Sequence, residues 1–256
     1  MKISDIYKLL DTLAPFSLQL DYDNSGMLIG SLQQDADTVL FALDVTDRVI
    51  DEAIACGAEL IISHHPLMFS SRKQITDSDY EGRLILRLIR NNIALISAHT
   101  NLDSAPNGTN DTLAKVCGLT SVTGTGFGRI GYLPKPIPAR VLKSDLKVRL
   151  ATEVRIMGDP EKLISSLAVC SGSGSEEWKK YLSYDIDGFL SGEIRHHHAL
   201  AMTGAGIVAF ECGHFATEQP GIFAFADALQ TAVNQIKCNL RIFKSASGAY
   251  PMLRNP

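Results

Sequence analysis

The stretch that decides the fold is "DTVLFALDVTDRVIDEAIACGAELIISHHPLMF", residues 37 to 69. Residues 37–45 form an apolar run typical of a buried strand, and residues 58–63 form a second one. Between them, Thr46 is a helix N-cap residue and Gly57 is a typical helix stop. The order strand, helix, strand predicts a βαβ unit with parallel strands.

The same alternation continues along the chain. A helix at 80–92 and a strand at 93–98 extend the unit to βαβαβ, and residues 1–16 read as an amphipathic helix. The Gly- and Pro-rich segment 120–138 interrupts the alternation of strands and helices. We therefore predict one α/β lobe over 1–125 and a second over 126–256. In the second lobe we expect strands at 153–158, 168–174, 187–193, 207–213 and 239–245, and helices at 159–168, 175–182, 195–206 and 217–235.

Composition excludes several classes of protein. The chain has 256 residues, 45% of them hydrophobic, and a net charge of −4 without a Lys/Arg cluster, so a nucleic-acid binder is not expected. No apolar run reaches the roughly 20 residues that span a bilayer, and the N-terminus does not resemble a signal peptide. We therefore expect a cytoplasmic protein. The five cysteines are scattered without a C-x-x-C pair, which predicts small core residues rather than disulfides or a zinc ribbon.

Residues that bind metals follow three of the predicted strands, where functional groups gather in open α/β sheets. Each of them alone is more often structural, but their coincidence at three strand ends favours a metal site. The donors exceed what one hydrolytic ion usually takes, which indicates two ions about 3.5 to 4 Å apart with a bridging carboxylate. The candidates are His64 and His65, then His99 and Asp103, then His214 and Glu218.

Three of these candidates carry a more specific expectation. His214 and Glu218 are four residues apart, so on a helix they lie on the same face and can reach the same ion or ion pair. His99 is either a ligand, a group hydrogen-bonded to a ligand, or a proton shuttle.

Two glycine-rich segments compete as ligand sites. "GFGRIG" (126–131) matches G-x-G-x-x-G, but prolines rather than a helix follow it, so we interpret it as a tight turn instead of a dinucleotide fingerprint. "CSGSGSEEW" (170–178) places a small-residue loop before a predicted helix. A phosphate site and an ordinary turn are equally consistent with that pattern.

Ordered motifs across nearly the whole chain resemble the Nif-three-like family, also called GTP cyclohydrolase 1 type 2 homologues. The motifs are "YDNSGMLIG", "FALDVTDRVIDEAI", "AELIISHHPLMF", "AHTNLD", "GTNDTLA", "GFGRIGYL", "SGEIRHHHAL" and "CGHFATE". The resemblance implies two intertwined α/β lobes with mixed sheets, a dinuclear metal site between them at the C-terminal ends of strands, and a toroidal homohexamer. It is the compact form, because the interval from Pro138 to Val154 is too short for an inserted domain.

The resemblance also assigns residues and an activity. It implies that the metal ligands are His64, His65, Asp103, His214 and a bridging Glu218, and it favours Glu193 and His197 as groups that face the site. The leading hypothesis is a hydrolase of a nucleotide or related small molecule, in which one ion generates hydroxide and the other polarises the attacked group. The family label implies hydrolytic opening of the guanine ring of GTP. His99, Glu193 or His197 would move protons.

Two rival hypotheses stay open: a non-catalytic ring-shaped scaffold that binds partner proteins, and a protein for metal storage or delivery. A His and carboxylate set accepts Zn, Fe, Mn, Co or Ni, so the sequence does not choose the metal.

Overall fold

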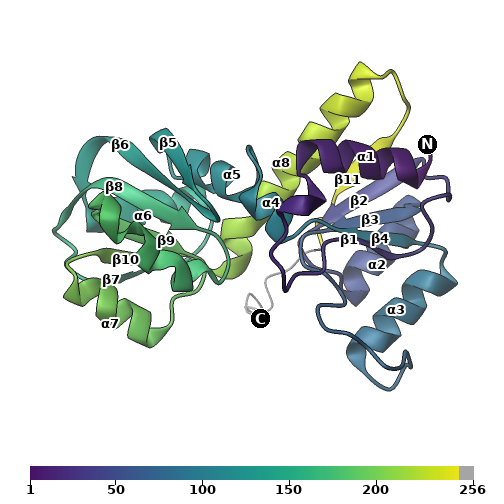
Figure 1. Ribbon diagram of the computed structural model, residues 1–256, viewed down its shortest axis with the longest axis horizontal. Coiled ribbons are helices and arrows are strands. Elements are labelled where there is room, and N and C mark those ends of the chain that lie inside the picture. Colours follow the sequence, from purple (N-terminus) through teal and green to yellow (C-terminus); the bar gives the residue numbers. More distant parts are fainter. Residues whose placement is uncertain (248–256) are drawn as a thin grey trace. The chain divides into compact units, whose positions relative to one another are not determined.

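The computed structural model describes residues 1–247 and divides the chain into two compact units (Figure 1). The first unit comprises Met1–Ala105 and Ile222–Pro256, and the second comprises Pro106–Gly221. No helix in the described part of the chain combines the length and the apolar character needed to cross a membrane.

The first unit is built on a five-stranded sheet with the order β1-β4-β3-β2-β11. Strands β2, β3, β4 and β11 are parallel, and β1 runs antiparallel to β4 at one edge. The predicted βαβαβ unit is therefore confirmed. The elements are α1 (Ile3–Leu13), the 3₁₀ turn η1 (Phe16–Leu18), β1 (Gly26–Ile29), β2 (Thr38–Ala42), α2 (Asp47–Cys56), β3 (Leu60–Ser63), α3 (Tyr80–Arg90), β4 (Ala94–Ser97), α4 (Thr100–Ser104) and β11 (Arg241–Lys244).

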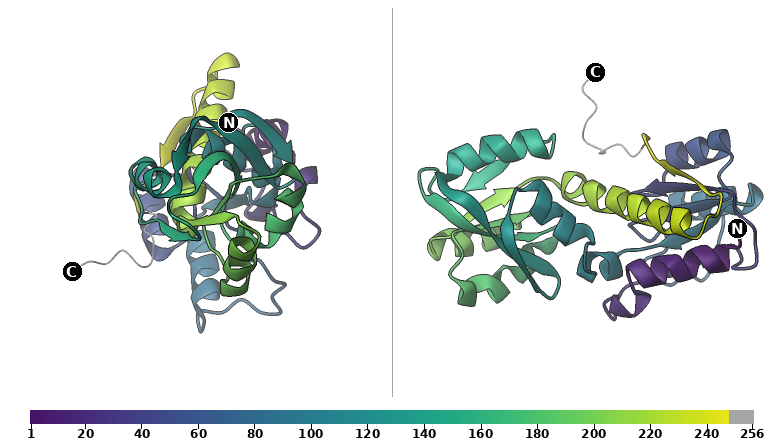
Figure 2. Two further views of the ribbon diagram at one scale, coloured as in Figure 1. Left: turned by 90° about the vertical axis from the view of Figure 1, so that its left-hand side faces the viewer. Right: turned by 90° about the horizontal axis from the view of Figure 1, so that it is seen from above.

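Helices cover both faces of this sheet, which is why every residue of β2, β3 and β4 is buried. Leu40, Ile61 and Leu95 pack with α2 and α3 on one face. Helix α1 and the C-terminal part of α8 (His214–Gln235) lie over the other face, where the Phe41 and Phe225 rings meet edge to face (Figure 2). Helix α2 is capped as expected: Thr46 accepts a hydrogen bond from the Val49 amide.

The second unit is built on a six-stranded sheet with the order β5-β6-β8-β9-β10-β7. The central strands β8, β9 and β10 are parallel, whereas β5, β6 and β7 pair antiparallel. The elements are α5 (Thr109–Val116), β5 (Thr120–Thr125), β6 (Gly128–Pro138), α6 (Ala139–Arg149), β7 (Arg155–Met157), β8 (Leu163–Cys170), the 3₁₀ helix η2 (Gly174–Tyr184), β9 (Gly188–Ser191), α7 (His196–Gly204) and β10 (Val208–Glu211), followed by the start of α8.

Alternating residues of the central strands face two separate cores. Leu167 and Val169 pack with α5 and α6, whereas Ala168 and Cys170 pack with η2 and α7. The helix predicted over 159–168 is wrong, because most of that segment is strand β8. Its apolar residues fit helical spacing, but pairing with both β6 and β9 makes it a central strand.

The unit boundaries differ from the predicted division near residue 125. That position lies inside the second unit, because β5 and β6 form a hairpin in one sheet. The chain also returns to the first unit after Gly221, because β11 pairs in parallel with β2. The first unit thus depends on a strand pairing between segments that are distant in sequence.

The cysteines are free thiols, as the scattered pattern predicted. Cys117, Cys170 and Cys212 are buried in the second unit. Burial raises the pKa of the Cys117 thiol to about 12 and that of Cys212 well above its ordinary value. Cys117 and Cys212 are therefore packing groups rather than nucleophiles at neutral pH.

Candidate metal centre

Three imidazoles converge at one edge of the sheet in the first unit. His64 and His65 directly follow β3, and His99 follows the neighbouring parallel strand β4. Because both strands point the same way, their carboxyl ends deliver these side chains to the same place. One ring nitrogen from each histidine lies within 4.8 Å of the others, close enough for a common metal ion. The spacing of the strand ends thus accounts for three of the predicted candidates.

The Nδ1 atom of each imidazole is anchored by an oxygen. His64 Nδ1 donates to the Ala98 carbonyl at 2.8 Å, which fixes the proton on Nδ1 because a carbonyl only accepts. His65 Nδ1 lies 2.7 Å from Asp44 Oδ1. His99 Nδ1 lies 2.7 Å from Asp23 Oδ1. This is the arrangement that orients histidines in metal sites, and it leaves Nε2 as the ring atom that could coordinate an ion.

Asp103 contributes a carboxylate to the same group. It lies on the short helix α4, is 2% exposed, and places Oδ1 3.6 Å from His64 Nε2. That separation is longer than a hydrogen bond. In a tetrahedral site, ligand bonds of 2.0–2.2 Å put neighbouring donor atoms about 3.3 to 3.6 Å apart, so the observed separation allows both atoms to bind one ion.

Asp23 orients His99 and is itself fixed by further hydrogen bonds. Its Oδ2 accepts hydrogen bonds from the Thr100 amide at 3.0 Å and the Ser25 hydroxyl at 2.9 Å. Burial raises the pKa of Asp23, but hydrogen bonds from His99 and Thr100 outweigh it and keep that pKa well below its usual value. Asp23 is therefore a carboxylate at neutral pH and favours a proton on His99 Nδ1.

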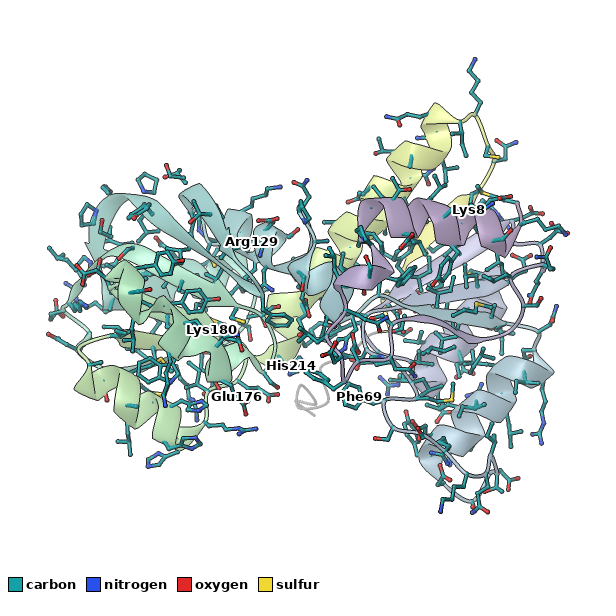
Figure 3. The ribbon with its side chains drawn as sticks, in the orientation of Figure 1. Lys8, Phe69, Arg129, Glu176, Lys180 and His214 are labelled. Carbon is teal, nitrogen blue, oxygen red and sulfur yellow. The ribbon has the colours of Figure 1, made fainter. Side chains whose placement is uncertain are left out.

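The second unit carries its own His and Glu cluster at the start of α8. His214 is the first residue of the helix (Figure 3), and its Nε2 lies 3.0 Å from Glu218 Oε2 one turn later. The four-residue spacing places the two side chains together as predicted. His214 Nδ1 lies 3.0 Å from Glu193 Oε1, which orients this imidazole in the way that Asp44 orients His65.

Glycines let the backbone approach this cluster closely. Gly172 has φ +58°, and a Cβ added there would lie 2.0 Å from Glu218 Oε1. A Cβ at Gly192 would lie 2.7 Å from the His214 Cα. The loop is fixed, because the Gly172 amide donates to Thr217 Oγ1 at 3.1 Å and its carbonyl accepts from the Glu193 amide at 2.9 Å. Any side chain at these two positions would displace the cluster.

The remaining candidates lie elsewhere or are engaged within the protein. His197 is exposed on α7 with its ring 4.2 Å from that of His198, so a role in proton transfer stays a prediction. In the 170–178 segment, the Ser171 amide donates to Asn110 Oδ1 at 2.8 Å, and the Gly172 amide is engaged as above. These contacts favour an ordinary structural turn over a phosphate site.

The "GFGRIG" segment is the turn of the β5–β6 hairpin, as interpreted from its prolines. Arg129 from this segment (Figure 3) is 5% exposed and binds Asp111 through Nε at 2.6 Å. Its guanidinium also donates to the Gly128 carbonyl at 2.9 Å. The arginine is a structural group of the second unit.

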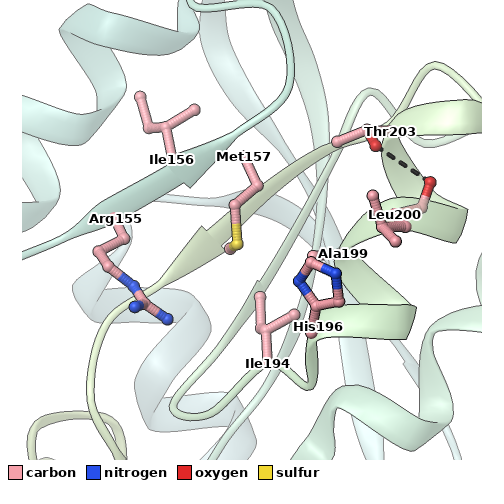
Figure 4. A pocket seen from close by; sticks show the side chains of 8 residues that line it. All are labelled: Arg155, Ile156, Met157, Ile194, His196, Ala199, Leu200 and Thr203. Atoms are coloured by element: carbon pink, nitrogen blue, oxygen red, sulfur yellow. Dashed lines mark hydrogen bonds between the residues drawn. The ribbon is translucent and has the colours of Figure 1, made fainter.

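A cavity of about 470 Å³ in the second unit lacks comparable chemistry (Figure 4). It lies beside β7 and α7 and is lined mainly by apolar side chains. Arg155 on its wall pairs with Glu211 at 2.5 Å, and the Thr203 hydroxyl donates to the Leu200 carbonyl at 3.0 Å. Among the described residues, no set of metal-binding atoms converges there, so the His and carboxylate clusters are the better candidate site.

Sequence reasoning missed two carboxylates of the site and the contact of a third. Asp44 follows strand β2, so the strand-end criterion that selected the histidines also applies to it. Asp23 precedes β1 in a turn, and no periodicity or spacing marks it. Glu193 forms a hydrogen bond with His214 that sequence reasoning did not predict, and its role as an acid or base stays a prediction.

The fold and the two clusters define an α/β protein with two mixed sheets and a histidine-rich site of the kind that binds metal ions. The sequence pattern of the Duf34/NIF3 (NGG1p interacting factor 3) family matches residues 1–251. The chain belongs to this family.

Individual relatives span the whole chain. A GTP cyclohydrolase 1 type 2 homolog from Clostridium acetobutylicum is 31% identical over 262 residues, which cover 98% of each protein. The crystal structure of the Staphylococcus aureus protein SA1388 superposes with a TM-score of 0.94 at 28% identity, covering 98% of both chains. A Bacillus cereus protein related to NIF3 superposes equally well, with a TM-score of 0.94, but at 23% identity it supports the fold alone.

Proposed function

We propose that this protein is a metal-dependent hydrolase of a nucleotide or related small molecule, and that its predicted ligands hold two divalent ions. The observation that carries the proposal is the convergence of three imidazoles whose Nδ1 atoms are each anchored by an oxygen. Such anchoring restricts ring rotation and raises the basicity of Nε2. A histidine that only fills a core does not need two neighbours oriented in the same way.

The donor set fits divalent transition metals. Neutral imidazoles and carboxylates suit Zn, Fe, Mn, Co and Ni, and the choice among them depends on geometry and supply. In this proposal His64, His65 and Asp103 bind from the first unit, and His214 and Glu218 bind from the second. Glu218 would bridge the ions, because a carboxylate has two oxygens that can bind different ions, whereas His214 offers one nitrogen.

Ions in such a site polarise the attacked group and lower the pKa of bound water. The side chains of this chain supply orientation and proton transfer. The Asp23 carboxylate holds His99 Nδ1 at 2.7 Å and so orients this imidazole, which is the proposed group for proton transfer in the reaction. Glu193 keeps the Nε2 atom of His214 directed at Glu218.

The names of the relatives support a nucleotide as the substrate class. The Clostridium acetobutylicum protein is a GTP cyclohydrolase 1 type 2 homolog, which makes hydrolytic opening of a purine ring the first reaction to test. We further propose, from the family resemblance, that the protein works in the cytoplasm as a homohexamer. A stable monomer at micromolar concentration in light scattering would contradict the hexamer.

The test measures metal and turnover on the same samples. Protein reconstituted with each of the five metals is assayed against nucleotides and phosphoesters, with Asp103→Ala as the paired variant. We expect about two tightly bound ions per chain and turnover that Asp103→Ala abolishes. Full metal occupancy without turnover on any substrate would refute the hydrolase and favour the scaffold or storage hypotheses instead. A stoichiometry of one ion with every metal would refute the dinuclear centre.

A further inference from the structure

A second pocket lies beside the imidazole cluster. It encloses about 340 Å³ in the first unit and lies between the loop at 22–24 and the loop at 68–72. Its wall includes Tyr22, Asp23 and Phe69, and the same Asp23 anchors His99. The pocket is therefore one side chain away from the candidate centre. It is at the small end of the range for ligand sites, enough for one fused ring system.

Two aromatic side chains are exposed at this pocket. Tyr22 is 63% exposed and Phe69 is 50% exposed. Phe69 is labelled in Figure 3. The centroids of the two rings are 6.2 Å apart and the ring planes are inclined by 54°. The Phe69 ring also lies 6.2 Å from the His99 ring, edge to face at 82°. Aromatic groups left open to water beside a candidate catalytic cluster indicate a surface for an apolar, planar ligand.

Hydrogen bonds and ion pairs hold the loops that carry the two aromatic residues. Asn24 Nδ2 donates to the Met68 carbonyl at 2.5 Å, which joins one loop to the other. Three residues after Phe69 in the same loop, Arg72 donates to Asp79 at 2.6 Å and also binds Glu81. The aromatic surfaces are thus positioned before a ligand arrives, which reduces the entropy lost on binding.

The geometry and the charges select the kind of group that fits. A ring sandwiched between two aromatics needs parallel planes about 7 Å apart, since stacked carbons contact at about 3.5 Å. An inclination of 54° excludes a sandwich but allows a ring to stack on one aromatic and meet the edge of the other. Asp79 and Glu81 neutralise Arg72, so its charge does not favour a phosphate group.

We propose that Tyr22 and Phe69 bind the planar heteroaromatic ring of the substrate and hold it next to His99. This inference rests on the proposed function, because it assigns the base-binding part of the same site. The phosphate or sugar of a nucleotide would then lie outside this pocket. The aromatic pair would determine that the substrate has a ring of nucleobase type.

The experiment measures binding rather than turnover. Zinc-loaded protein is titrated with guanosine and, separately, with ribose 5-phosphate, and dissociation constants are obtained by equilibrium dialysis. We expect guanosine to bind at least about tenfold more tightly than ribose 5-phosphate. Tyr22→Leu and Phe69→Leu should each weaken guanosine binding about tenfold, equal to about 1.4 kcal/mol at 25 °C. Neither substitution should change the dissociation constant of ribose 5-phosphate.

Control variants test whether the loss of guanosine binding is specific to the aromatic rings of residues 22 and 69. Tyr22→Phe and Phe69→Tyr retain a ring and should restore guanosine binding. Tyr184→Leu removes a similarly exposed aromatic, 51% exposed, from the second unit and should have no effect. Zinc content and molecular mass are measured for every variant, because a pair of exposed aromatics can also pack against a second copy of the chain.

Three results would overturn the inference. They are guanosine binding no tighter than ribose 5-phosphate, leucine variants that bind guanosine normally, and leucine variants that change only the molecular mass. The proposed hydrolase function would be refuted by different results. Absence of turnover with intact, ring-dependent guanosine binding would refute the hydrolase alone, whereas turnover of substrates that lack an aromatic ring, unaffected by the leucine variants, would refute the aromatic subsite alone.

Discussion

Gly172→Ala tests whether the Glu218 carboxylate has to occupy its observed position to hold metal. A methyl group at residue 172 would lie 2.0 Å from Glu218 Oε1 and 3.0 Å from His214 Nε2, whereas real Cβ contacts essentially never fall below 3.0 Å. Hydrogen bonds to both sides of the Gly172 peptide fix the loop, so the carboxylate has to move by about 1 Å. Ligand distances in metal sites hold to within about 0.2 Å, so this shift breaks the ligand bond.

The substitution has two separable effects. A left-handed φ of +58° costs a non-glycine residue roughly 1–2 kcal/mol of stability. Gly206 has φ +78° with nothing within 4 Å of the added Cβ, so Gly206→Ala carries the backbone cost without the steric clash. Both variants should lose similar stability in urea unfolding. Only Gly172→Ala should lose metal affinity, by more than the about 10- to 100-fold that loss of an outer hydrogen-bond partner causes.

The assay is metal analysis by mass spectrometry after dialysis, followed by calorimetric titration with zinc. If Gly172→Ala retains the same zinc stoichiometry and affinity as Gly206→Ala, then Glu218 is not a ligand in the observed geometry. A loss of zinc in both variants would instead attribute the effect to general destabilisation.

Three further predictions concern single side chains. Glu218→Gln removes the negative charge between two cations and should weaken both ions together, whereas His64→Ala should weaken mainly one; a zinc titration distinguishes the two patterns. Asp44→Asn should lower zinc affinity about 10- to 100-fold, measured by calorimetry, because a ligand imidazole loses its anchoring carboxylate. Asp111→Asn should cost about 3 kcal/mol in urea unfolding at pH 7, because it leaves the buried Arg129 cation without its carboxylate.

The pH dependence of the third prediction follows from the pKa of Asp111. Burial raises that pKa, but the hydrogen bond and charge of Arg129 outweigh burial and lower it. The folded value is thus below the unfolded value of about 3.9. The pair stabilises the protein above that value and loses its contribution as the pH falls through the folded pKa. The difference in the free energy of unfolding between wild type and Asp111→Asn should therefore become smaller below about pH 4. A difference that does not change with pH would contradict a stabilising Asp111–Arg129 ion pair.

Controls for the other two predictions come from the same chain. Glu153→Gln changes a carboxylate that is 81% exposed and should leave zinc affinity unchanged, in contrast to Asp44→Asn. Equal effects of these two variants would show that net charge, rather than orientation of the imidazole, controls affinity. If Glu218→Gln loses a single ion while His64→Ala loses both, the bridging role belongs elsewhere.

The sequence by itself was sufficient for the alternating α/β pattern of the first unit and for grouping the candidate metal ligands at strand ends. These depend on local signals, because a buried parallel strand needs a continuous apolar run and its crossover helix needs a cap and a stop. His64, His65 and His99 could be grouped from the order of the strands alone, since parallel neighbouring strands end at the same edge. The i, i+4 spacing of His214 and Glu218 is likewise a local property of a helix.

The tertiary structure decided the features that depend on contacts between distant segments. Residues 163–170 have a spacing that suits a helix, and only pairing with β6 and β9 makes them a strand. The hydrogen bond of Asp23 to His99 spans 76 positions in the chain, and that of Glu193 to His214 spans 21. Side-chain identity and spacing do not encode such pairs, because the atoms meet only after the sheet has brought their strands and loops together.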